Sequence, residues 1–161
     1  MAEAEQSGPK PKPERPRDQF GRPLPAGSAN VLELPDFDSM TLEECHETAM
    51  QMFDEGHYFG AHEAWETCWG FAKETEEEEF FKGLAQLGAG FTHWQRGNAH
   101  GVVALLDRAL ERIGSMGSSH RGIDVAVFTS LTSAVRDRAR EAEERREAPG
   151  ELPEVRVPRT G

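Results

Sequence analysis

The sequence has few cysteines and no long apolar run. Cys45 and Cys68 are the only two cysteines, and the absence of Cys-x-x-Cys spacing argues against a disulfide framework or a zinc finger. We expect both to act as small buried hydrophobic residues. No apolar run approaches the roughly 20 residues of a membrane-spanning helix, and the first residues lack the pattern of a secretory signal. We therefore expect a cytoplasmic protein with no membrane partner.

Basic residues are also scarce relative to acidic ones. The 161 residues include 18 Lys and Arg against 29 Asp and Glu, which gives a net charge of −11. Duplex nucleic acid and anionic membranes attract clustered Lys and Arg, so this balance argues against nucleic acid as a partner. The length suits one hydrophobic core. Homo-oligomerisation stays open.

Prolines concentrate at the two ends of the chain. Seven of the ten prolines lie within residues 1–36, among mixed charges and without apolar periodicity. We expect residues 1–36 to form a Pro-rich arm that is largely disordered or extended. The last 15 residues contain the other three prolines, so we expect a disordered tail over residues 147–161. Residues 37–146 are left as the helical domain.

Between these ends the apolar residues recur at spacings of three and four, which predicts helices. Thr41 and Glu44 form a capping box, Gly56 closes the first helix, and Asp124 caps the last one. The segment 114–122 is expected to be a flexible connection, and no strand pair is evident. The predicted fold is all-α, an antiparallel bundle of about five helices. The expected helices are 41–55, 58–73, 77–96, 99–113 and 125–146.

The second helix carries His62, Glu63 and Glu66 in an H-E-x-x-E pattern. His62 and Glu66 are spaced i, i+4 on an otherwise apolar face, and the third helix carries Gln86 and His93. If these helices are antiparallel neighbours, His62, Glu66 and His93 converge as ligands of one divalent metal ion, which would activate water for hydrolysis. Glu63 is then the candidate catalytic base, and Gln86 orients the substrate or a ligand.

Two other interpretations fit the same residues. The pattern lacks the second histidine of H-E-x-x-H, so Glu66 could instead accept a hydrogen bond from His62 or His93 in a buried structural network. The protein would then be a non-catalytic binding or assembly module. A metal-free pocket for a small molecule is the third alternative, lined by Trp65, Trp94, Gly90 and Gln86.

The remaining polar candidates give weaker signals. Arg96 precedes Gly97 and Asn98 at a tight joint, where it could bind an anion at the start of the next helix or form a salt bridge. The other histidines are expected at helix surfaces or in loops, solvated rather than ligating; they are His46, His57, His100 and His120.

Two blocks of the chain resemble a known family. The first is Gly56-x-Tyr58-Phe59-x-Ala61-His62-Glu63-x-x-Glu66-x-x-Trp69, and the second runs from Gly83-Leu84-x-Gln86-Leu87 to His93-x-x-Arg96-Gly97-Asn98-x-x-Gly101. Both are similar to the domain of unknown function 309 family. The resemblance implies an all-α fold and a bacterial, cytoplasmic protein, and some members carry the label of metal-dependent hydrolase. It marks as motif residues His62, Glu63, Glu66, Trp69, Gln86, His93, Arg96 and Asn98, with a departure at Gly70.

Overall fold

The computed structural model describes residues 17–18, 20–23, 25 and 32–160. The chain divides into one unit that ends at Glu33 and a second unit that begins at Leu34. Most of the predicted arm, residues 1–36, therefore lies outside the described residues. Its described part contains a turn in which the Asp18 carboxylate accepts the backbone N–H groups of Phe20 and Arg22 and pairs with the Arg22 guanidinium.

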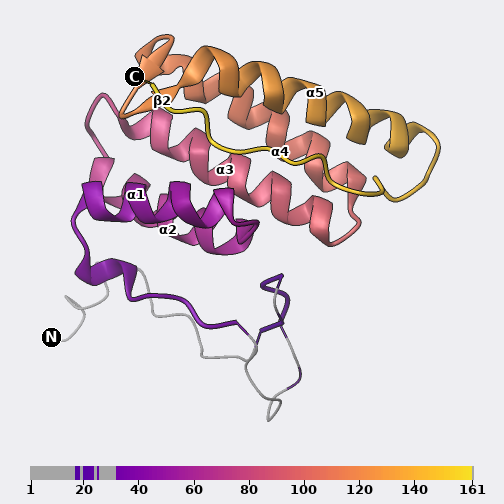
Figure 1. The fold of residues 1–161 in the computed structure, drawn as a ribbon, viewed down its shortest axis with the longest axis horizontal. Coiled ribbons are helices and arrows are strands. Elements are labelled where there is room, and N and C mark those ends of the chain that lie inside the picture. The colour runs from indigo at the N-terminus through magenta and orange to yellow at the C-terminus, as the bar shows by residue number, and fades with distance from the viewer. Residues whose placement is uncertain (1–16, 19, 24, 26–31, 161) are drawn as a thin grey trace, which may run out of the picture. The chain divides into compact units, whose positions relative to one another are not determined.

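The second unit is a bundle of five helices, as the sequence predicts (Figure 1). Each helix packs mainly on its neighbours in sequence, so α3 lies between α2 and α4. The loops that join α1 to α2, α2 to α3 and α3 to α4 are short, so each of these helices runs antiparallel to the next. The helices are α1 (Leu42–Asp54), α2 (Tyr58–Ala72), α3 (Glu78–Gln95), α4 (Ala99–Arg112) and α5 (Val125–Glu144), with short 3-10 turns η2 (Phe37–Ser39) and η3 (Ile113–Met116).

The helix boundaries follow the capping signals in the sequence. The Thr41 side chain accepts the Glu44 N–H while the Glu44 carboxylate accepts the Thr41 N–H, so the predicted capping box is confirmed. Gly56 follows α1 with a φ of 85°, a left-handed conformation that glycine adopts without steric cost. Asp124 accepts the Val127 N–H at the start of α5, also as expected.

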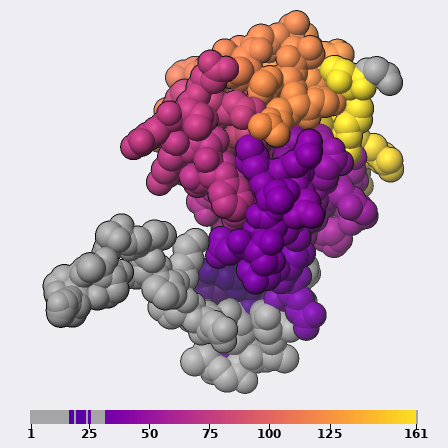
Figure 2. Space-filling model, turned by 90° about the vertical axis from the view of Figure 1, so that its left-hand side faces the viewer, coloured from indigo at the N-terminus to yellow at the C-terminus, as the bar shows by residue number. Residues whose placement is uncertain are grey.

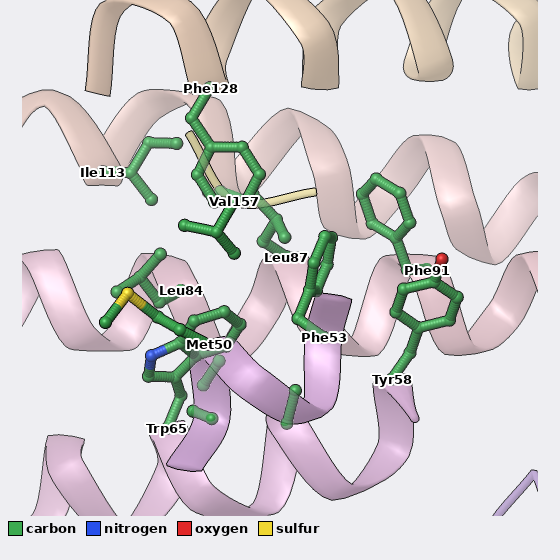
Figure 3. Close-up of a cluster of buried hydrophobic side chains, with 14 of the residues drawn as sticks. Met50, Phe53, Tyr58, Trp65, Leu84, Leu87, Phe91, Ile113, Phe128 and Val157 are labelled. Atoms are coloured by element: carbon green, nitrogen blue, oxygen red, sulfur yellow. The ribbon is translucent and has the colours of Figure 1, made fainter. Parts of the chain in front are cut away.

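One hydrophobic core joins all five helices. Figure 3 shows Phe53 of α1, Trp65 of α2, Leu87 of α3 and Phe128 of α5 packed together, and each is fully buried. Cys45 and Cys68 are buried free thiols, which confirms the expectation drawn from their spacing. None of the described helices is long and apolar enough to cross a membrane.

The connection before α5 is more ordered than predicted. Two antiparallel strands, β1 (Ser119–His120) and β2 (Ile123–Asp124), form a small hairpin where neither a strand pair nor a regular structure was expected. Glu77 holds this hairpin: its carboxylate accepts hydrogen bonds from Arg121 and from His120 at 2.7 Å. These partners, Arg121 first, lower the pKa of Glu77 to about 2.

The tail that was expected to be disordered, residues 147–161, is instead packed against the helices of the second unit over its described residues. Beyond α5 the chain turns back, and its last described residues lie beside β2 (Figure 1), where residues 123 and 159 form a β-bridge. Figure 2 shows this yellow segment against the orange surface of the same unit. Val155 and Val157 are buried in the core, and Asp54 of α1 accepts the Val157 N–H at 2.7 Å. We refer to residues 150–160 as the C-terminal strap. The hydrogen bond to Asp54 and the burial of the two valines stabilise the strap in a packed position. This stabilisation offsets the conformational entropy that the Pro-containing segment loses when it is ordered.

His46 also differs from expectation, because it is buried rather than solvated. Its Nδ1 accepts the Trp65 indole N–H at 3.1 Å, so its Nε2 carries the proton and donates to the Arg121 carbonyl at 3.0 Å. Both ring nitrogens of the neutral imidazole are therefore satisfied. Burial is the main cause that lowers the pKa of His46 to about 4.

The neutral state of His46 predicts a loss of stability in mild acid. In the unfolded chain this side chain takes up a proton near pH 6.5, whereas in the folded protein it does so only near pH 4. The unfolded state thus binds more protons between these values, and the free energy of unfolding should fall by about 3 kcal/mol as pH drops from 6.5 to 4. Urea unfolding of wild type and His46→Asn across this range checks it, since the variant should lack this component. Parallel pH dependences would contradict it.

Candidate metal centre

The site is built where the backbones of α2 and α3 lie close together. A Cβ atom added at Gly88 of α3 would lie 3.0 Å from both the backbone N and the Cα of His62 in α2. The absence of a side chain at Gly88 therefore lets the His62 backbone rest against α3. This close approach brings the His62 ring within reach of the α3 backbone.

The ring of His62 is oriented by a backbone carbonyl. Its Nδ1 lies 2.8 Å from the carbonyl oxygen of Ala85. A carbonyl only accepts, so Nδ1 carries a proton, and in the neutral ring Nε2 keeps its lone pair. Metal-binding histidines are held in this way, with one ring nitrogen donating to a fixed acceptor and the other facing the ion.

Two carboxylates face that second nitrogen. One oxygen of Glu63 and one of Glu66 each lie 3.7 Å from His62 Nε2. One candidate ligand atom from each of the three residues lies within 4.8 Å of the other two. The side chains are 19%, 24% and 41% exposed in the order His62, Glu63, Glu66, so the group is accessible from solvent yet rooted in the helix packing.

His93 does not join these three residues. Among the described residues, the group of candidate ligands contains Glu63 in the place where the sequence predicted His93. Asn98 accepts the Gly101 N–H through Oδ1, so its Nδ2 donates to His93 Nδ1 at 3.1 Å. The neutral His93 ring therefore carries its proton on Nε2. Burial is the main cause that lowers the pKa of His93, and the positive charge of Arg96 adds to it.

His93 and His62 do share a pocket. A hollow of about 170 Å³ opens on α2 and α3, beside the three candidate ligands. The guanidinium of Arg96 lies over the Phe59 ring, 5.9 Å from its centroid, and both residues line the hollow. The complete lining is Phe59, His62, Ala89, Thr92, His93 and Arg96.

The other predicted site residues are placed around this centre. Gln86 accepts a hydrogen bond from Arg112 of α4 at 3.2 Å, which ties α3 to α4. Asn98 caps α4 and orients His93. Trp69 lies one turn beyond Glu66, with the ammonium groups of Lys73 and Lys82 about 5.5 and 5.4 Å from its ring. Gln86 and Trp69 thus contact neighbouring helices and lysines, outside the lining of the pocket.

Sequence reasoning missed three parts of the site. Phe59 stood out as part of the family-like block but not as a site residue, and Thr92 gave no signal, yet both line the pocket. The Ala85 carbonyl could not be found from side-chain patterns, because any residue supplies that oxygen. The neighbouring acid, Glu63, was recognised but given a different role.

The fold and these residues define the class: a five-helix bundle with a candidate His/Glu metal centre. Residues 46–105 match the model of a family described as Domain of unknown function (DUF309). The match confirms the resemblance seen in the sequence, and the matched segment contains His62, Glu63 and Glu66. The comparisons found no matching curated protein and no matching solved structure.

Proposed function

We propose that His62, Glu63 and Glu66 bind a divalent transition-metal ion and that the protein is a metal-dependent hydrolase of the cytoplasm. One observation carries the metal site: His62 Nε2, which has a lone pair in the neutral ring, lies 3.7 Å from one oxygen of each of two carboxylates, too far for hydrogen bonds. Three acceptors that face one another repel, and a shared cation relieves that repulsion. The proposal of a cytoplasmic protein is supported by Cys45 and Cys68, two buried thiols that form no disulfide bond.

The ligand types fit such an ion. One imidazole and two carboxylates suit Mn²⁺, Fe²⁺ or Zn²⁺, and three protein ligands leave coordination positions open on the solvent side. An ion in an open site of this kind lowers the pKa of a bound water toward about 7, which is the chemistry that hydrolysis needs. In this proposal Glu63 is a ligand, and the role of catalytic base that the sequence suggested for it is withdrawn.

Metal titration of the tag-free protein tests the site. After treatment with a chelator and its removal, calorimetric titration with Mn²⁺ or Zn²⁺ should show about one equivalent bound, in line with one three-ligand site. Glu63→Gln and Glu66→Gln keep the side-chain shape but remove the charge, and each should weaken binding at least about tenfold. Glu47→Gln on the exposed face of α1 is the matched control and should bind like wild type.

The alternative, a structural network in a binding or assembly module, predicts a different result. Its support is the His62–Ala85 hydrogen bond, which ties α2 to α3. In that case neither Mn²⁺ nor Zn²⁺ binds stoichiometrically. His62→Ala then lowers the melting temperature and leaves metal uptake unchanged. Uptake below about a tenth of an equivalent would refute the metal proposal. Equal affinities in wild type and both glutamine variants would refute this ligand set.

A further inference from the structure

The pocket beside His62 is lined by basic rather than acidic residues, in a strongly acidic protein. None of its six lining residues is acidic, although the chain carries a net charge of −11. Two imidazoles and a guanidinium line it instead, together with an aromatic ring, a hydroxyl and a methyl group. The Thr92 hydroxyl donates its proton to the Gly88 carbonyl at 2.8 Å, so Thr92 is not counted among the donors for a ligand.

The His93 ring is fixed as a hydrogen-bond donor. Gly101 N–H sets the orientation of the Asn98 amide, and that amide donates to His93 Nδ1, so the free position Nε2 bears the proton. The ring also lies directly against Gly101, where an added Cβ would come within 2.7 Å of it. Its position and its tautomer are therefore both set before any ligand arrives.

Arg96 supplies a permanent charge at the same pocket. It is the C-cap residue of α3, and its guanidinium lies over the Phe59 ring. A guanidinium carries five N–H donors in a planar fork, so it can bind a carboxylate or phosphate in addition to the contacts it already makes. Placement over an aromatic face limits its motion and favours that use.

We propose that this pocket binds the oxyanion of a small ligand, a carboxylate or a phosphate, with Arg96 and His93 as donors and Phe59 as the apolar wall. The idea that the anion belongs to a substrate rests on the proposed function. His62 lines the pocket and also faces Glu63 and Glu66, so a ligand held here by its anion would extend toward the candidate metal centre.

Amide-resolved NMR tests the pocket without metal. Chelator-treated, uniformly ¹⁵N-labelled protein is titrated with inorganic phosphate and, separately, with acetate, at constant ionic strength with chloride. Saturable shifts are expected at the amides of Ala89, Thr92, His93 and Arg96, with a dissociation constant in about the millimolar range for so small a probe. Shifts with phosphate alone identify a tetrahedral oxyanion site, and shifts with acetate alone identify a carboxylate site; either result supports the proposal.

Two variants distinguish binding in the pocket from nonspecific attraction of anions to basic residues. Ala89→Leu fills the pocket and keeps every charge, whereas Arg96→Gln removes the guanidinium; each should raise the dissociation constant at least tenfold. The controls are Ala134→Leu and Arg108→Gln, both at exposed positions on α5 and α4, and they should stay within twofold of wild type. Melting curves verify that all four variants fold.

The outcomes are distinct from those of the metal test. Non-saturating shifts, shifts spread over amides remote from the pocket, or equal affinities in Ala89→Leu and wild type would overturn the oxyanion pocket. Anion binding in a protein that takes up no Mn²⁺ or Zn²⁺ would leave the pocket established and the metal proposal refuted. Metal uptake without any anion-induced shifts would refute the oxyanion pocket and leave the metal proposal standing.

Discussion

Val157→Asp is expected to lower the melting temperature by about 10 °C or more. Val157 is 3% exposed and lies in the core with Phe53, Leu87 and Phe128 (Figure 3), where an aspartate carboxylate would be surrounded by apolar side chains. Burying an unpaired carboxylate costs roughly 3–5 kcal/mol, and each kcal/mol shifts the melting temperature of a domain this size by about 3–5 °C. The C-terminal strap would leave the core, exposing apolar surface that it now covers.

Two further variants make this result specific. Val157→Ala keeps the strap apolar and should cost only about 2 kcal/mol, through lost burial and a small cavity. Arg156→Ala changes the neighbouring residue, whose side chain is 69% exposed, and should leave the melting temperature unchanged within error. Thermal unfolding followed by circular dichroism measures all three. A stable Val157→Asp protein would mean that the strap is not part of the folded core in solution.

Local signals predicted the helices well, because each boundary depends on neighbouring residues. The capping box at Thr41, the left-handed Gly56 and the cap at Asp124 act within one turn of the chain, so a sequence window contains everything that decides them. The strap depends on a partner about a hundred residues away. Asp54 binds the Val157 N–H, and no local pattern in a Pro-containing segment records that contact.

The candidate site was predictable where it depends on spacing along one helix, and not where it depends on contacts between helices. The spacing of His62 and Glu66 on an apolar helix face placed them together, and the structure does so. His93 was expected beside them, yet its ring is oriented by Asn98, a tertiary hydrogen bond that helix periodicity does not contain. Glu63 lies 100° around the helix from His62, but its side chain is long enough to reach the same point.

Gly88→Val is expected to disturb both the fold and the candidate metal centre. Its Cβ would stand 3.0 Å from two backbone atoms of His62, and backbone cannot rotate away as a flexible side chain can. The branched methyl groups add further overlap, so α2 and α3 must separate. We expect a loss of about 3 kcal/mol or more in the free energy of unfolding, even though valine has the better intrinsic helix propensity.

Gly70→Ala is the matched control, because nothing lies within 4 Å of a Cβ added at Gly70 in α2. This variant should gain roughly 0.5–1 kcal/mol, since alanine replaces glycine in a helix without a clash. Opposite signs for the two glycines, measured by urea unfolding, would show that close approach and not helix propensity governs Gly88.

Separation of the helices also lengthens the His62–Ala85 hydrogen bond, which orients the ring for the metal ion. Gly88→Ala, which adds the smallest side chain, should therefore weaken Mn²⁺ binding several-fold. Gly70→Ala should leave Mn²⁺ binding intact. Unchanged metal affinity in a folded, destabilised Gly88→Ala protein would separate the metal centre from the helix contact that we assign to it.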